Sequence, residues 1–154
     1  PVAFALEGVE GVAYFSPRGG RLAREALLKR LSEAQREVLV AAFVLTDREV
    51  LEALLQARRR GAEVKVLLET RNLGTSREEA LLEEGPEVRQ DANPYTMHHK
   101  VLLLDGTYVV TGSYNFSVRA HEVNNENLLV LKSPSLAERY RKEVLRLWEA
   151  GSPL

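Results

Sequence analysis

One stretch of the sequence reads His98-His99-Lys100-Val101-Leu102-Leu103-Leu104-Asp105 and continues, six residues later, with Gly112-Ser113-Tyr114-Asn115. The apolar run 101–104, the turn-prone Asp105-Gly106 and the run 108–111 predict two strands joined by a tight hairpin. Side chains alternate along a strand, so His98 and Lys100 point the same way and His99 points the other way. Ser113 and Asn115 are two residues apart and can face one site together. The site would then combine an imidazole, a cation, a hydroxyl and an amide. Such a set of groups can bind a phosphate and attack it.

Outward from this hairpin, strands alternate with helices along most of the chain. Apolar runs predict further strands, and helical spacing or capping residues predict four helices. The strands are expected over 9–16, 38–45, 63–69, near residue 88 and over 128–131, and the helices over 22–34, 46–60, 76–85 and from 133 onward, with Thr46 and Ser133 as N-caps. Short connections between these elements predict an α/β sandwich, with a mixed, mostly parallel sheet and helices on both faces. No linker divides the chain, so residues 1–154 are expected to form a single domain.

Composition narrows the classes of protein. The formal net charge of −1 gives no general attraction to nucleic acid, so any anion site must be local. The chain has no cysteine, which excludes disulfides, thiolate catalysis and cysteine-ligated zinc. No apolar run approaches the ~20 residues that a transmembrane helix needs. The start at Pro1 fits a secreted or periplasmic chain that has lost its signal as well as it fits a trimmed one, so the location stays open.

The spacing of the opening stretch, His98-x-Lys100-x4-Asp105 followed by Gly112-Ser113-x-Asn115, resembles the signature of the phospholipase D superfamily. The segments 14–17 and 124–127 and the terminal helix with Trp148 extend the likeness to the small bacterial endonucleases that carry a single copy of this motif. The resemblance covers nearly the whole chain. It implies a nuclease that hydrolyses DNA or RNA with little sequence preference and uses no metal or other cofactor.

The resemblance also implies a role for each residue of the motif. His98 would attack phosphorus and form a covalent phosphohistidine, and a second histidine would protonate the departing oxygen and then activate water. Lys100 and Asn115 would donate to the non-bridging oxygens, with Ser113 as a supporting phosphate contact. Glu126 would hydrogen-bond to His98 and orient it.

Three further residues complete the expected site. Asp105 and Gly112 look like structural members of the motif, and Arg119 is the arginine that we expect nearest to the site, because it follows the loop from Gly112 to Asn115. Arg71, Arg77 and Arg89 are weaker candidates for contacting phosphate. The run 58–60, three arginines at a helix end, is more simply a solvated helix terminus.

The chemistry implied by the resemblance needs two imidazoles, but the motif occurs once. His99 points away, and His121 is followed by Glu122 and lacks a lysine at the required spacing. The second His98 must then come from another copy of the chain, because a twofold axis brings identical residues face to face. The sequence therefore predicts a C2 homodimer with the active site on its axis.

Three alternatives stay open. The same site could serve a phosphodiesterase acting on phospholipid head groups, although no strongly basic amphipathic helix is present and no stable membrane association is expected. The chain could instead be a nucleic-acid-binding dimer with a silent site. A metal site would draw on the histidines and carboxylates at positions 98, 99, 121, 122 and 126, but they lack the spacing of a zinc site.

Overall fold

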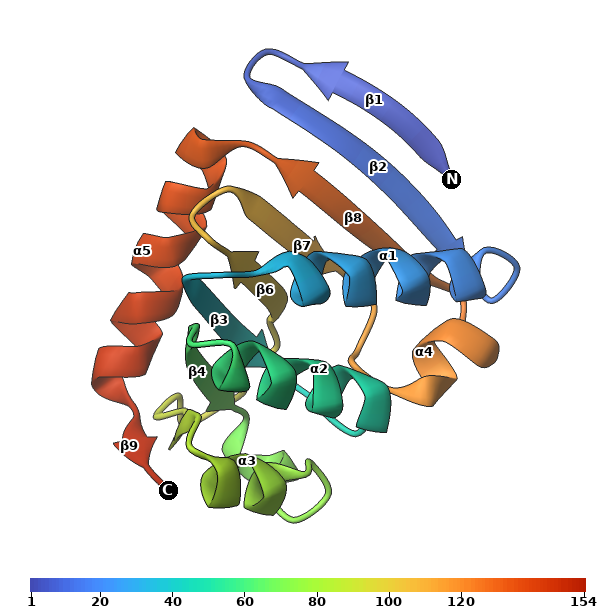
Figure 1. Ribbon diagram of the computed structural model, residues 1–154. Helices are drawn as coiled ribbons and strands as arrows, with labels where there is room; N and C mark the ends of the chain where they lie inside the picture. Colours follow the sequence, from blue (N-terminus) through green and yellow to red (C-terminus); the bar gives the residue numbers. More distant parts are fainter.

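The computed structural model describes residues 1–154 as one nine-stranded sheet with helices packed against it (Figure 1). In chain order the elements are β1 (Val2–Leu6), β2 (Val9–Ser16), α1 (Gly20–Glu33), β3 (Glu37–Ala42), α2 (Arg48–Arg59), β4 (Glu63–Leu68), the 3-10 turn η1 (Thr70–Asn72), α3 (Glu78–Glu84), β5 (Glu87–Gln90), β6 (Lys100–Leu104), β7 (Tyr108–Gly112), α4 (Val118–Glu122), β8 (Glu126–Lys132), α5 (Pro134–Ala150) and β9 (Ser152–Pro153). No helix combines the length and the apolar character needed to cross a bilayer.

The sheet is mixed, as expected, but parallel pairing is less common than the sequence suggested. The strands follow the order β1-β2-β8-β7-β6-β3-β4-β5-β9. Only β3–β4 and β4–β5 pair in parallel, whereas all the other neighbours are antiparallel. The β1–β2 and β6–β7 hairpins impose antiparallel pairing, since a tight turn cannot join parallel strands. The expected α/β sandwich is therefore confirmed, with a correction: parallel strands are the minority.

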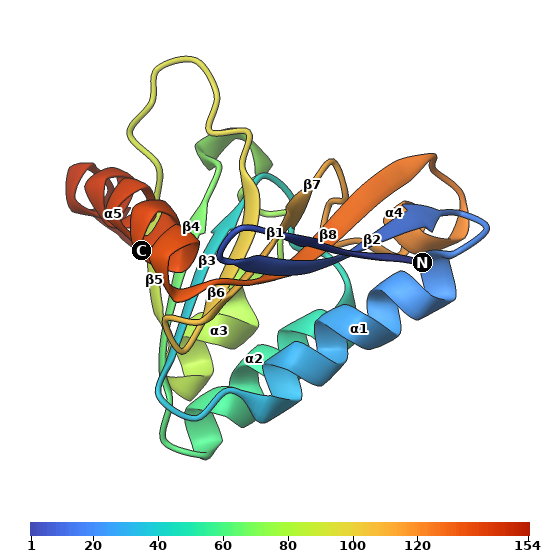
Figure 2. The ribbon, with the colours of Figure 1, turned by 90° about the horizontal axis from the view of Figure 1, so that it is seen from above.

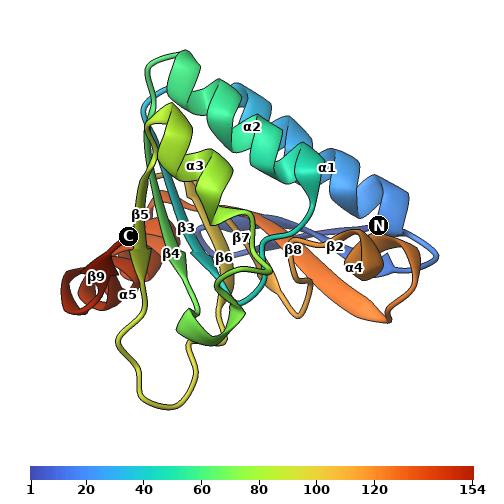
Figure 3. The ribbon, with the colours of Figure 1, turned by 90° about the horizontal axis from the view of Figure 1, so that it is seen from below.

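Helices cover both faces of the sheet, and each face has its own core. Figures 2 and 3 show α1, α2 and α3 on one side and α5 on the other. Alternate residues of β3 serve the two sides, because Val38 and Val40 pack toward α1 and α2, while Leu39 and Ala41 pack toward α5. The larger core lies under α1–α3 and the smaller one under α5. The continuous apolar run of β3 is thus explained by burial on both faces.

Several local signals predicted the elements well, and others did not. Ser133 caps α5 as expected, since its side chain accepts a hydrogen bond from the Leu136 N–H. The expected cap of α2 at Thr46 is wrong, because Asp47 is the N-cap and accepts from the Glu49 N–H. No pattern singled out in the sequence predicted β1, α4 or β9. β1 is apolar but mostly exposed, and α4 and β9 are only five and two residues long.

The topology brings several strand ends to one edge of the sheet. Because β6 runs antiparallel to β3, Lys100 at its start pairs with Ala42 at the end of β3. In the same way Gly112 at the end of β7 pairs with Leu128 near the start of β8, and Ser16 at the end of β2 pairs with Glu126. The quoted histidine, lysine, serine and asparagine therefore belong to a single edge.

Candidate active site

His98 and Lys100 form the centre of this edge. The Lys100 Nζ lies 2.9 Å from His98 Nδ1 and 3.3 Å from His98 Nε2, and it donates to the His98 carbonyl oxygen at 2.6 Å. The two side chains therefore share one side of the strand, as alternation predicted. His98 itself is exposed, which leaves the imidazole open to an incoming molecule.

Lys100 is a buried cation, 7% exposed, in a largely apolar setting. Its Nζ lies 5.0 Å from the centre of the Phe43 ring, and that ring packs at 4.5 Å from the imidazole of His98. Burial lowers the pKa of Lys100, and the nearby Glu126 carboxylate opposes this shift. Phe43 was not singled out from the sequence, where it lay inside the expected strand 38–45, whereas β3 ends one residue before it.

Ser113 and Glu126 come together from the ends of β7 and β8. The Ser113 hydroxyl donates to Glu126 Oε1 at 2.7 Å and accepts from the Asn127 N–H at 3.0 Å. The other carboxylate oxygen of Glu126 accepts from the Asn124 side-chain amide at 3.2 Å. Glu126 makes no hydrogen bond to His98 in the free protein, so its expected contact with the imidazole is not present in this structure. It lies close enough to Lys100 to influence the pKa of that amine.

Asn115 follows β7, and its side-chain oxygen is buried without a hydrogen-bond partner. A buried polar atom left unpaired costs free energy in the folded protein, and such atoms are found where a ligand or water completes the bonding. The sequence pointed to this residue, and its unpaired oxygen can accept a hydrogen bond from a donor group.

Gly112 allows β7 and β8 to approach closely beside the site. Its φ of 141° lies in the region that favours glycine, and an added Cβ would stand 2.3 Å from the Asn127 carbonyl oxygen. No side chain fits there without moving the backbone of β8. The expected structural role of Gly112 therefore has a steric cause.

Asp105 lies at the other end of β6, roughly 17 Å along the strand from Lys100. Its carboxylate accepts from the backbone N–H groups of Gln35, Arg36 and Glu37 at 2.8 to 2.9 Å, which fixes the hairpin turn to the start of β3. Burial alone would raise the pKa of Asp105, but these three hydrogen bonds outweigh it and lower the pKa. The residue thus holds the sheet rather than contacting the site.

The remaining histidines do not supply a second imidazole within one chain. The His99 Nε2 lies 4.0 Å from Glu143 on α5, on the opposite side of the strand from His98. His121 belongs to α4, and its Nε2 is buried without a hydrogen-bond partner. No group of three or more histidine, aspartate and glutamate side chains is arranged to hold a metal ion.

The candidate arginines mostly have structural partners. Arg89 and Arg77 donate to the backbone oxygens of Trp148 and Thr46. Arg60 caps the C-terminus of α1 by donating to Leu31 and Ala34, and Arg59 pairs with carboxylates. The end of the basic run was expected to be solvated, so the capping by Arg60 is a correction.

Arg119 is exposed on α4 and forms no hydrogen bond or ion pair through its side chain. It therefore stays a candidate for contacting phosphate. Arg71 donates to Pro94 and Thr96 in the loop that precedes His98. It is therefore bonded to the loop that carries the site histidine.

Comparison with known proteins assigns the family. The family model described as "Cardiolipin synthase, PLD-like domain" matches residues 27–148. The chain belongs to the phospholipase D superfamily. The structure also resembles the phospholipase D family member Nuc from Salmonella typhimurium, with a TM-score of 0.87 and 30% identity over 95% of this chain and 98% of Nuc. NucT from Helicobacter pylori shares the fold, with a TM-score of 0.85 at 22% identity and coverage of 95% and 99%.

Curated relatives in the phospholipase D superfamily carry lipid-related names. The chain is 36% identical to the mitochondrial cardiolipin hydrolase of Xenopus laevis over 82% of its own length and 61% of that protein. It is 33% identical to a phospholipase D of Rickettsia typhi over 82% and 62% of the two chains. The chain thus spans about three fifths of the length of these relatives.

Proposed function

We propose that this member of the phospholipase D superfamily is a metal-independent phosphodiesterase that hydrolyses DNA or RNA with little sequence preference. One observation carries the proposal: an exposed His98 imidazole stands beside a buried Lys100 cation at an open edge of the sheet. A nucleophile next to a fixed positive charge suits attack on a phosphodiester, because the charge stabilises the developing negative oxygens.

The proposed reaction has two steps with balanced proton transfers. In the first, a ring nitrogen of His98 forms a bond to phosphorus while the bond to the departing oxygen breaks and a second imidazole gives that oxygen a proton. In the second, the same imidazole takes a proton from water, the hydroxide attacks phosphorus and the bond to His98 breaks. The product is a phosphomonoester, and both histidines return to their first state.

Lys100 and Asn115 supply the donors in this proposal. The Lys100 ammonium stands next to the nucleophile and can donate to a phosphate oxygen. Asn115 would donate through its side-chain N–H2 group, because its buried Oδ1 can only accept hydrogen bonds. Loss of one fixed donor of this type raises a barrier by about 3 kcal/mol. Ser113 would assist through its hydroxyl, and Arg119 would contact a neighbouring phosphate.

A second copy of the chain would supply the second imidazole. His98 is exposed, His99 faces α5, and His121 lies on α4 with its Nε2 buried, so one chain offers one imidazole at the edge. A twofold axis beside His98 would bring two copies of the motif together. We therefore propose a C2 homodimer with one active site on the axis.

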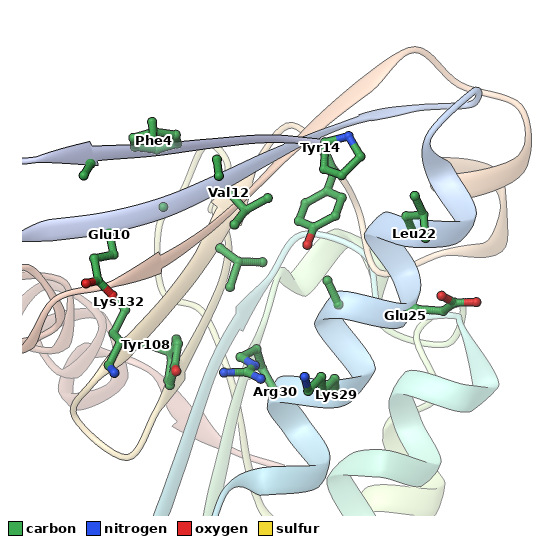
Figure 4. Close-up of a pocket in the computed structure, with 16 residues that line it drawn as sticks. Phe4, Glu10, Val12, Tyr14, Leu22, Glu25, Lys29, Arg30, Tyr108 and Lys132 are labelled. Atoms are coloured by element: carbon green, nitrogen blue, oxygen red, sulfur yellow. The ribbon is translucent and has the colours of Figure 1, made fainter.

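Lipid hydrolysis is the second candidate, because relatives are named phospholipase D and cardiolipin hydrolase. An acyl chain would need an apolar path near His98. The structure has an apolar groove of about 890 Å³ between the β1–β2 hairpin and α1, drawn in Figure 4 with Tyr14, Leu22 and Tyr108 among its walls. None of the proposed site residues lines it, which favours nucleic acid over lipid.

The decisive test measures hydrolysis of single-stranded DNA, duplex DNA, RNA and phospholipid vesicles, each with and without EDTA, by the wild type and by His98→Ala. Cleavage of nucleic acid that resists EDTA and is lost in His98→Ala supports the proposal, and trapping phosphate on His98 identifies the nucleophile. Hydrolysis of vesicles alone would establish the lipid alternative. Activity lost with EDTA and restored by a divalent cation would refute metal independence. Equal DNA binding by both proteins with no cleavage would indicate a silent site.

A further inference from the structure

The loop that delivers His98 to the site carries the most exposed aromatic side chain of the protein. Residues 91–99 connect β5 to β6, and Figures 2 and 3 show this connection projecting beyond the edge of the sheet. Tyr95 in this loop is 79% exposed. Tyr95 and His98 are three positions apart in the chain, so their two Cα atoms lie no more than about 11 Å apart.

The backbone on either side of Tyr95 is held by hydrogen bonds. The Arg71 guanidinium donates to the Pro94 carbonyl oxygen at 3.2 Å and to the Thr96 hydroxyl at 2.6 Å, and so grips both neighbours of Tyr95. Asn93 accepts from the Tyr95 N–H at 2.8 Å and donates to the Thr96 carbonyl oxygen at 3.2 Å. The loop backbone is thus held by hydrogen bonds on both sides of Tyr95, while the ring itself stays exposed.

The segment after β4 also anchors both ends of the loop. The Thr70 hydroxyl donates to the Asp91 carbonyl oxygen at 2.7 Å, and buried Glu69 accepts from the Met97 N–H at 3.3 Å. Asn72 extends the same clamp to Phe43, whose carbonyl oxygen accepts from the Asn72 amide at 2.7 Å. The four consecutive side chains 69–72 therefore bond to the loop and to the backbone of Phe43, whose ring packs on His98.

We infer that Tyr95 is a stacking platform for an unpaired nucleobase next to the scissile phosphate, an inference that rests on the proposed nuclease function. Proteins that bind single strands without reading their sequence combine local cations with aromatic rings on which bases stack. Tyr95 supplies the ring, and Lys100 supplies the cation near the reacting phosphate. A braced loop loses little entropy when a base stacks on it.

Tyr95 is a poorer candidate for a membrane contact. The loop sequence around it is Ala92-Asn93-Pro94-Tyr95-Thr96, so one ring stands among polar and small neighbours. Stable insertion at a lipid interface requires an apolar face of several side chains. A single fixed ring is enough for one base to stack on, but it is too small an apolar surface to hold the protein at a bilayer.

The consequence for specificity is a preference for single strands. In a duplex the bases are paired and stacked on each other, so none is free to lie on Tyr95. A loss of this ring should therefore weaken cleavage of single-stranded DNA or RNA more than cleavage of a duplex.

The test compares two single-stranded oligonucleotides with the same phosphates, one with bases and one built entirely of abasic sugars. The readout is the ratio of kcat/KM on the first to kcat/KM on the second. Wild type should show a ratio well above one, and Tyr95→Ala should lower it about fivefold or more. Tyr95→Phe and Tyr95→Trp should keep the ratio, because they keep the ring. Leu6→Ala, which removes a side chain that is 68% exposed on β1, is the matched surface control.

The same assay separates failure of this inference from failure of the proposed function. Cleavage of both oligonucleotides with a ratio that Tyr95→Ala leaves unaltered would overturn the stacking role and leave the nuclease in place. If wild type cleaved neither oligonucleotide, both the stacking role of Tyr95 and the proposed nuclease function would be refuted. If Tyr95→Ala reduced hydrolysis of anionic phospholipid vesicles but not the oligonucleotide ratio, Tyr95 would be a lipid contact instead. Arg71→Ala should lower the ratio by a smaller factor, since it frees the loop but keeps the ring.

Discussion

Glu126 Oε1 accepts a hydrogen bond from the Ser113 hydroxyl at 2.7 Å, and no bond joins Glu126 to His98. The carboxylate therefore acts on the site through its charge and through Ser113. Its charge raises the pKa of Lys100 against the larger, opposite effect of burial. Glu126 thus has two effects on the site: it positions the Ser113 hydroxyl, and it raises the pKa of Lys100. A single substitution can change either effect alone.

Glu126→Gln should lower the pKa of Lys100 further. The amide can still accept from Ser113, but it no longer raises the pKa of Lys100, so the amine loses its proton earlier as pH rises. An NMR titration of the Lys100 side-chain amine measures this shift. Ser113→Ala is the control, because it removes the hydroxyl and keeps the carboxylate charge. A Lys100 titration that stays in place in Glu126→Gln, or moves equally in Ser113→Ala, would contradict this account.

Lys100 should lose its proton at a lower pH than an ordinary lysine. Burial lowers its pKa from the ordinary 10.5, so an NMR titration of its side-chain amine should have a midpoint below 10.5. Lys100→Arg should be slower, because a planar guanidinium presents its donors in a different geometry from an ammonium. A Lys100 midpoint at or above 10.5 would contradict the burial of this amine.

Mixing wild-type subunits with inactive His98→Ala subunits should show whether two chains share one active site. If both copies of His98 serve one site, only dimers of two wild-type chains are active after exchange with His98→Ala. Activity should then follow the square of the wild-type fraction, so about a quarter remains in an equal mixture. Strict proportionality to the wild-type fraction would mean that each chain works alone. Light scattering on the same samples would report whether the active species is a dimer.

Gly112→Ala should destabilise the protein far more than Gly106→Ala. Both glycines have positive φ, 141° and 65°, but a Cβ at Gly112 meets the Asn127 carbonyl oxygen at 2.3 Å, whereas at Gly106 nothing lies within 4 Å. We expect about 1 kcal/mol for Gly106→Ala and about 3 kcal/mol or more for Gly112→Ala. Denaturant unfolding measures the stability of both variants. Equal losses of stability would show that the backbone of β8 moves at little cost to make room for the new Cβ.

Asp105→Asn should lower stability by roughly 1–3 kcal/mol at neutral pH, because an amide cannot accept all the N–H groups that the carboxylate satisfies. The folded-state pKa of Asp105 lies below the ordinary 3.8. The carboxylate therefore stabilises the fold above pH 3.8, and this contribution disappears as pH falls through the lowered pKa. The difference in the free energy of unfolding between Asp105→Asn and wild type, measured by denaturant unfolding at several pH values, should become smaller in that acid range. Glu87→Gln, an exposed carboxylate without a hydrogen-bond partner, is the control and should show no such narrowing.

Local signals predicted much of the fold. The β6–β7 hairpin follows from apolar runs around Asp105-Gly106, and the start of α5 follows from Ser133-Pro134, because turn and cap chemistry involve neighbouring residues. The direction of most strand pairs could not be predicted in this way. The place of β8 between β2 and β7 depends on its pairing with β2, which lies more than a hundred residues earlier in the chain.

The candidate site shows the same division. The types and spacing of His98, Lys100, Ser113 and Asn115 identify the motif without any structure, because the family signature is a local pattern. The role of Arg60 as a cap of α1 and the place of Glu126 beside Ser113 were not predictable, since both depend on which elements meet in space.

By itself, then, the sequence determined the chemical groups of the site and the order in which the chain presents them. The tertiary structure decided that Lys100 is buried against Phe43, that Asp105 is committed to the start of β3, and that Tyr95 stands on a braced loop. The physical reason is that burial, charge and hydrogen bonding depend on neighbours in space, and the pairing of distant strands chooses those neighbours.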